Sequence, residues 1–134
     1  MATIKAYTDL EQSKKLAEFL PIKSADMFYL HENNQAKTMS PSKLSEILNV
    51  SKPQVIPCWS LAALFDILPK DEGIDCSISF GYYNGKGEYI EKWLCAFEKE
   101  GETTDDFIIE TIDGDNPIDA CVAMIECLHK LNLL

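Results

Sequence analysis

Apolar positions in the middle of the chain recur with the period of an α-helix. Four of them stand at i, i+3, i+4 and i+7 and predict a single apolar stripe: Leu61, Leu64, Phe65 and Leu68. Ser60 before the stripe is a good N-cap residue, and Pro69 after it cannot continue a helix. Trp59 and Leu64 have the N′ and N4 spacing of a hydrophobic staple. The pattern predicts a short helix, with Trp59 in the core.

The N-terminal half has two further helical patterns. The run Thr8-Asp9-Leu10-Glu11 has the residues of a capping box and predicts a helix that ends before Pro21. Its inward positions are expected to be Leu10, Leu16, Ala17 and Leu20. A second helix is predicted over residues 40–48, with serine as N-cap and proline at N1. Residues 25–30 predict a short strand, and residues 51–57, with two prolines, an irregular connector.

The C-terminal half changes to an alternating pattern. Residues 74–80 alternate apolar and polar side chains and predict a half-buried strand. Asn84-Gly85 predicts a tight hairpin turn, followed by a return strand over 88–99 and a third strand over 106–112. Asn116 and Pro117 predict the N-cap and N1 of a last helix. Its apolar face is expected to contain Ile118, Cys121, Val122, Ile125 and Leu128, widened by Met124 and Leu131.

These elements predict an α+β fold. We expect a small antiparallel sheet of three or four strands, packed against about four helices. A length of 134 residues suits one domain with a sizeable core, so residues 1–134 are expected to form a single domain.

The net charge of the chain limits its binding partners. The chain has 12 lysines and no arginine against 22 acidic residues, for a net charge of −10. Strong nucleic-acid binding needs a basic surface and relies heavily on arginine. We therefore expect no direct binding to DNA, RNA or an anionic membrane.

The acidic residues concentrate between positions 98 and 119, where nine of them accompany one lysine. This window suggests a face that docks on a basic partner protein. The residues expected to bind such a partner are Glu98, Glu100, Glu102, Asp105 and Asp106. The alternative is that the same charges only keep the surface soluble.

The cysteines and acidic loops give no metal site. The five cysteines at 58, 76, 95, 121 and 127 include no C-x-x-C pair and suit reduced, buried thiols. Cys121, Cys127 and His129 are spaced 6 and 2 apart, so they do not converge on one metal ion. A calcium loop starting at Asp113 would need glycine at 118 and glutamate at 124, where the chain has Ile118 and Met124.

Catalytic patterns are equally missing from the sequence. Neither His31 nor His129 accompanies a nucleophile motif, and the glycines near the hairpin form no phosphate-binding loop. We expect neither an enzyme nor a bound cofactor. A second interpretation concerns the aromatic residues Tyr82, Tyr83, Tyr89 and Trp93 near the hairpin. They would line a small-molecule pocket or a homodimer surface, or simply form cross-strand pairs.

Several segments together carry a family resemblance. Thr8-Asp9-Leu10-Glu11-Gln12-Ser13-Lys14-Lys15-Leu16, Ala25-Asp26-Met27-Phe28-Tyr29, Pro57-Cys58-Trp59-Ser60-Leu61 with Leu68-Pro69, and Asn116-Pro117-Ile118-Asp119-Ala120 occur in this order. Together they resemble a group of small proteins encoded in prophages and mobile elements of gut bacteria related to Bacteroides. The resemblance spans nearly the whole chain, and its motifs are helix caps and core positions. It implies an accessory phage or mobile-element protein, whose basic partner would be a host or phage protein. It supplies no catalytic or binding residues.

No apolar run approaches the roughly 20 residues that span a membrane. The N-terminus lacks the hydrophobic region of a secretory signal. We therefore expect the protein in the bacterial cytoplasm.

Overall fold

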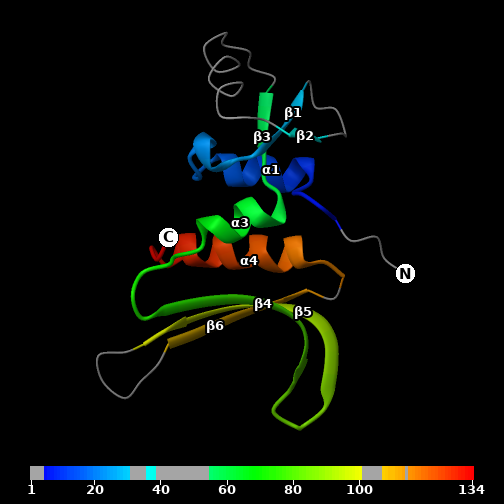
Figure 1. Cartoon of the computed structure of the whole chain (residues 1–134), viewed down its shortest axis with the longest axis vertical. Coiled ribbons are helices and arrows are strands. Elements are labelled where there is room, and N and C mark those ends of the chain that lie inside the picture. Colours follow the sequence, from blue (N-terminus) through cyan, green and yellow to red (C-terminus); the bar gives the residue numbers. More distant parts are fainter. Residues whose placement is uncertain (1–4, 31–35, 39–54, 101–106, 114) are drawn as a thin grey trace. The chain divides into compact units, whose positions relative to one another are not determined.

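The computed structural model confirms an α+β fold and describes residues 5–30, 36–38, 55–100, 107–113 and 115–134. In this part of the chain, three α-helices accompany two antiparallel sheets of three strands each (Figure 1). The single sheet that the sequence predicted is therefore replaced by two. The helix predicted over 40–48 lies outside the described residues.

Contacts within the chain divide it into two compact units. One comprises Ala6–Ala63, and the other comprises Met1–Lys5 with Leu64–Leu134. We call them the N-terminal and the C-terminal unit. Each has its own sheet, and the single domain expected from the chain length stays a prediction.

The N-terminal unit combines a helix with a small sheet. Helix α1 (Leu10–Ala17) and the 3-10 turn η1 (Ile22–Ser24) precede strand β1 (Met27–Leu30). Strand β1 lies in the middle of the sheet, between β2 (Ala36–Thr38) and β3 (Val55–Cys58). The strand predicted over 25–30 is confirmed. The connector predicted over 51–57 is wrong at its end, because residues from Val55 onward pair with β1.

The N-cap of α1 is one residue later than the capping box predicted from Thr8. Asp9 is the N-cap, and its carboxylate accepts a hydrogen bond of 2.8 Å from the Gln12 backbone. Gln12 returns the bond through its side chain to the Asp9 backbone at 3.0 Å. Thr8 is instead fully buried, as are Leu16 and, nearly, Leu20. Ala17, expected inside, is the last residue of the helix and is exposed.

The central helix begins where the sequence predicted. Helix α3 spans Leu61–Ile67, and the Ser60 hydroxyl accepts a hydrogen bond of 3.2 Å from the Ala63 backbone. Asp26 steadies this cap, because its carboxylate accepts bonds from both the backbone and the hydroxyl of Ser60. Trp59, Leu64 and Leu68 are buried as predicted. Phe65 is 37% exposed, so its place in the buried stripe was wrong.

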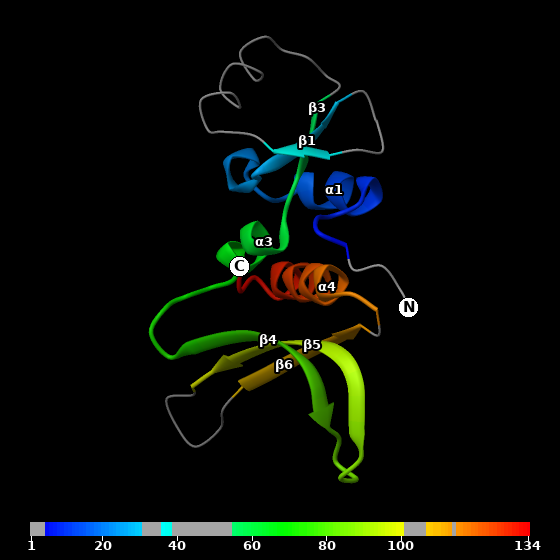
Figure 2. The same ribbon diagram turned by 45° about the vertical axis from the view of Figure 1, so that its right-hand side comes forward.

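The C-terminal unit is a three-stranded sheet with one helix over it. Strands β4 (Ile74–Tyr83), β5 (Tyr89–Lys99) and β6 (Phe107–Asp113) follow one another in the sheet, all antiparallel. Helix α4 (Pro117–Lys130) lies along one face of this sheet, as the two views agree (Figures 1 and 2). The three predicted strands and the last helix are confirmed.

The distal part of the β4–β5 hairpin curves away from the rest of the sheet (Figure 2). The strand register shifts between Phe80 and Tyr82, and Gly81 has a φ of +87°. A side chain at Gly81 would collide with the ring of Tyr89, so only glycine suits this position. At the turn, the Asn84 side chain accepts hydrogen bonds from the backbones of Lys86 and Glu88.

Helix α4 supplies most of the core of this unit. Its Asn116 cap accepts a hydrogen bond of 2.9 Å from the Ile118 backbone, with Pro117 at the start of the helix. The predicted apolar face is buried, including Ile118, Cys121, Val122, Ile125 and Leu128, and Met124 joins it. Leu131, expected to widen this face, lies beyond the last helical residue and is 48% exposed. Each fully buried large apolar side chain contributes about 1.5–3 kcal/mol.

Candidate functional site

The structure places two of the five predicted partner-binding residues. Glu98 lies near the end of β5, directly opposite Asp75 on β4 and Ile108 on β6. Glu100 follows β5, and its backbone N–H donates to the carbonyl of Gly73 over 2.9 Å. Glu102, Asp105 and Asp106 lie outside the described residues.

Glu98 and Glu100 line a shallow polar pocket of about 320 Å³ at the end of the hairpin strands. Its lining residues are Gly73, Ile74, Asp75, Glu98, Lys99 and Glu100. Three of these residues are acidic, and only Lys99 is basic. Like charges directly opposite each other in a sheet are destabilising, so the Asp75–Glu98 pair weakens the strand pairing unless a cation lies nearby. The pocket is therefore suited to a cationic side chain.

The face of the sheet opposite α4 is partly apolar and uncovered in the described residues. Thr111 points toward α4, since its hydroxyl donates to the Ala120 carbonyl over 2.7 Å, and Phe97 is fully buried on that side. Because side chains alternate along a strand, the residues between them face the other way. These residues form what we call the outer patch: Leu94, Ala96, Glu98, Ile108, Glu110 and Ile112.

The outer patch mixes exposed apolar side chains with acidic ones. Ile108 is 53% exposed and Ile112 is 48% exposed. Leu94 pairs with Ile112, Ala96 with Glu110, and Glu98 with Ile108, so no lysine stands within the patch. On β4 the outward residues are Asp75, Ser77 and Ser79, all exposed. Sequence reasoning found Glu98 but missed the apolar part, because residues 106–112 were interpreted only as a strand.

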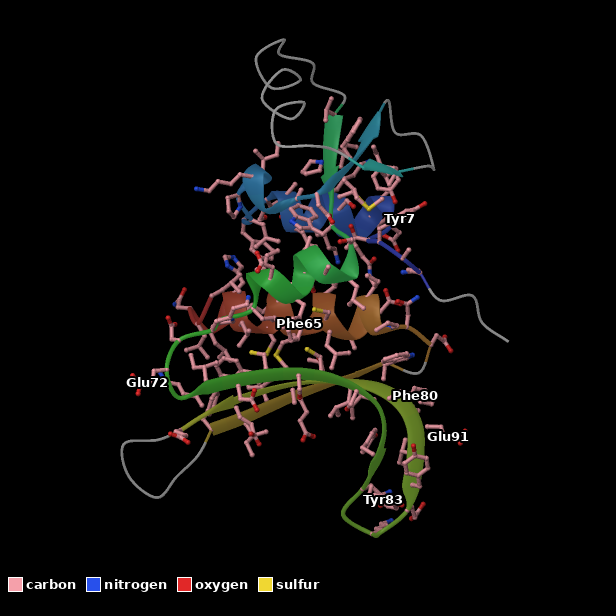
Figure 3. All side chains as sticks on the ribbon, viewed as in Figure 1. Tyr7, Phe65, Glu72, Phe80, Tyr83 and Glu91 are labelled. Atoms are coloured by element: carbon pink, nitrogen blue, oxygen red, sulfur yellow. The ribbon has the colours of Figure 1, made fainter. Side chains whose placement is uncertain are left out.

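The aromatic residues near the hairpin form cross-strand pairs. The rings of Tyr83 and Tyr89 lie 5.2 Å apart, and those of Phe80 and Trp93 lie 5.3 Å apart, at tilted angles. Figure 3 shows Phe80 and Tyr83 along β4 and Glu91 on the neighbouring strand. Tyr83 is 74% exposed. The cross-strand interpretation of these aromatic residues accounts for the contacts, and Phe80 was missed.

A buried polar cluster in the N-terminal unit centres on Thr8. The Thr8 hydroxyl bonds to the Ser13 hydroxyl at 2.8 Å and accepts the Trp59 backbone N–H at 3.1 Å. The Thr8 carbonyl accepts the Tyr29 hydroxyl at 2.8 Å and the Cys58 thiol at 3.3 Å. Burial raises the pKa of Cys58 and, with the nearby Cys58, that of Tyr29. Both groups therefore stay protonated at neutral pH, so this cluster supports the fold and provides no nucleophile.

Three further thiols lie between the sheet and α4. Cys95 and Cys121 are fully buried, and their thiols hydrogen-bond to each other. That bond lowers the pKa of Cys95 and raises the pKa of Cys121. Burial raises the pKa of the neighbouring Cys76. All five cysteines are free thiols, and no group of described residues has the arrangement needed to hold a metal ion.

Comparison of the sequence with family models, curated proteins and solved structures returned no significant match in any of the three. The resemblance to prophage proteins therefore stays a prediction. Among the described residues, no helix combines the length and the apolarity that crossing a membrane requires. The outer patch and the pocket beside it are thus the best candidate site that the chain itself supplies.

Proposed function

We propose that this protein is a non-enzymatic interaction module that docks on a basic protein, as an accessory protein of a phage or mobile element in a bacterial cytoplasm. One observation carries the proposal. Exposed Ile108 and Ile112 stand beside Glu98 and Glu110 on a sheet face that no described element covers. Exposed apolar side chains bordered by polar ones are typical of protein–protein interaction sites.

The charge of the site selects the partner. Glu98, Glu100 and Asp75 gather at one end of the patch, around the shallow pocket. A net charge of −10 repels other acidic proteins and accelerates the approach of basic ones. A lysine or arginine of the partner placed between Asp75 and Glu98 relieves their mutual repulsion. This relief is gained only in the complex, so it favours binding.

The test is a pull-down from the native host with wild-type protein and two variants. Glu98→Lys/Glu100→Lys reverses the charge at the pocket, and Glu88→Lys reverses an exposed charge at the hairpin turn. We expect wild type and Glu88→Lys to retain the same basic protein, and the double variant to lose it. Calorimetry with that purified partner then measures the affinity. The proposal fails if no basic protein is retained, or if the double variant retains it equally well.

A second candidate function follows from the aromatic hairpin. Tyr83, Tyr89 and Phe80 are between 51% and 74% exposed, and exposed aromatic residues are common where two protein surfaces meet. Self-association through the hairpin would cover them. Light scattering after size exclusion tests this: a dimer that Tyr83→Ser converts to a monomer supports it. A monomer at high concentration rules it out.

A further inference from the structure

The two edges of the β4–β5–β6 sheet differ in how they discourage pairing with another strand. Strand β4 has an irregular register at Gly81, and its outward residues Asp75, Ser77 and Ser79 are polar. Bulges and polar residues are the usual devices that protect an edge strand. Strand β6 has no register shift, and two of its three outward residues, Ile108 and Ile112, are apolar, with Glu110 between them. Its seven residues pair with β5 in one continuous register, and none of them is proline, glycine or lysine.

Strand β6 is also exposed on both faces. Phe107, on the α4 side, is 45% exposed, and Ile108 and Ile112 on the outer side are 53% and 48% exposed. Among the residues that the structure describes, β6 pairs with β5 alone. Its other edge therefore presents backbone N–H and C=O groups between apolar side chains. Such an edge is a template for an added strand, with backbone bonds giving affinity and alternate side chains giving specificity.

The side chains of β6 indicate which residues an added partner strand would carry. On the outer face, Glu110 stands between Ile108 and Ile112, two residues from each. A residue directly opposite Glu110 on an added strand would share this face, and its neighbours two positions away would lie opposite the isoleucines. A cation opposite Glu110, flanked by β-branched apolar residues, matches all three positions.

We infer that the free edge of β6 binds an extended segment of a basic partner protein as a fourth antiparallel strand, with a lysine or arginine opposite Glu110 and valine or isoleucine opposite Ile108 and Ile112. This inference rests on the proposed function and specifies the partner segment that the site recognises.

Charge argues against a second copy of this chain as the occupant. A two-fold antiparallel pairing that places Ile108 opposite Ile112 also places Glu110 directly opposite Glu110 of the other copy. Like charges in directly opposite positions are destabilising. Shifting the pairing by two residues places Glu110 opposite an isoleucine and leaves the apolar match incomplete. Each copy also brings a net charge of −10 to the encounter.

The test uses a fluorescein-labelled, blocked peptide with the core Val-Thr-Lys-Thr-Val, titrated with the full-length protein. One control peptide has glutamate in place of lysine, and a second has the same composition in scrambled order. Two more have N-methyl groups on alternate sets of amides. Only one of these two sets faces β6, so one methylated peptide should bind as well as the parent and the other should not bind.

Variants of the protein are tested against the same peptides. We expect Glu110→Lys to weaken binding of the lysine peptide about ten-fold and to strengthen binding of the glutamate peptide, since both the lost attraction and the new repulsion act. Glu88→Lys makes the same charge change at the hairpin turn and should alter the affinity less than two-fold. Both positions are exposed, so both variants should fold. Amide spectra of the ¹⁵N-labelled proteins confirm this and show whether the peptide shifts signals of β6 or of β4.

The outcomes separate this inference from the proposed function. Binding that follows the charge swap and one methylated set supports a strand at β6. Signals that shift on β4, or equal binding of both methylated peptides, overturn it. If the peptides fail while the basic partner from the pull-down still binds and depends on Glu98, the inference falls and the proposed function stands. If neither binds, both fall. A dimer by light scattering that Glu110→Lys disrupts assigns the edge to a second copy and also overturns the inference.

Discussion

Replacing Thr8 by valine tests how the N-terminal unit is held together. Thr8 is fully buried, and valine has nearly its shape but no hydroxyl. The substitution removes the hydroxyl that bonds to the Trp59 backbone N–H at 3.1 Å, the Ser13 hydroxyl at 2.8 Å and the Cys58 sulfur at 3.5 Å. The bonds to the Thr8 carbonyl from Tyr29 and Cys58 stay in place. The perturbation is therefore confined to one oxygen atom.

The expected cost follows mainly from the Trp59 N–H, which loses its acceptor. A buried donor that loses its acceptor costs about 1–3 kcal/mol. The Trp59 N–H is fixed in the backbone and bears this cost fully, whereas the Ser13 hydroxyl can rotate. We expect Thr8→Val to lower the free energy of unfolding by about 2–4 kcal/mol. Thr8→Ser keeps the oxygen and removes one buried methyl group, which costs about 1 kcal/mol.

Urea unfolding monitored by the fluorescence of Trp59 measures both values. Trp59 is fully buried in the N-terminal unit, and a Trp93→Phe background removes the other tryptophan. The double variant Thr8→Val/Ser13→Ala should cost at least about 0.5 kcal/mol less than the sum of the single variants, because both partners of one bond are removed together. The reasoning is refuted if Thr8→Ser is as destabilising as Thr8→Val, or if the two single effects simply add.

Three further predictions concern a turn, a cap and the buried thiols. Gly81→Ala should destabilise the protein by about 1–3 kcal/mol in thermal unfolding, because the backbone at Gly81 is left-handed and Tyr89 occupies the space of a side chain. The control Gly85→Ala, with open space around it, should change stability by less than about 1 kcal/mol in the same assay. Asn116→Ala should cost about 1 kcal/mol by removing the cap of α4, and Asn116→Asp should restore most of it, as urea midpoints would show. The pKa of Cys58 lies above its ordinary value of 9.0, so the native state keeps this proton longer than the unfolded state does. The resulting stabilisation is complete below pH 9 and is lost as the pH rises through the native pKa. The urea midpoint of Cys58→Ala should therefore fall less than that of wild type between about pH 8 and 10.5. Equal declines of the two midpoints would contradict the burial argument.

Local signals in the sequence determined where most elements begin and which class they belong to. Ser60 and Asn116 cap the helices that they were expected to cap, since a cap depends only on the residue and the next turn. Alternation over 74–80 and the Asn84 turn likewise predicted the β4–β5 hairpin. The capping box at the first helix was displaced by one residue because Thr8 and Asp9 are both good caps. Burial of the Thr8 hydroxyl among Ser13, Cys58 and Trp59 decided between them.

Long-range pairing decided the rest. Val55–Cys58 contains a proline and gave no strand signal, yet it pairs with β1, because β1 lies in the middle of its sheet and accepts a partner on each side. Phe65 matched the helical stripe but is exposed, since periodicity identifies a face and not what covers it.

The candidate site divides in the same way. The acidic residue Glu98 stood out from charge alone, whereas its neighbour Ile108, ten residues away, could be recognised only from the register of β5 with β6. Sequence separation hides such neighbours, because a sheet brings together residues whose relation depends on the pairing. Charge along the chain thus determined that this part of the surface is acidic. The tertiary structure alone decided that the acidic residues border an apolar strand with an open edge.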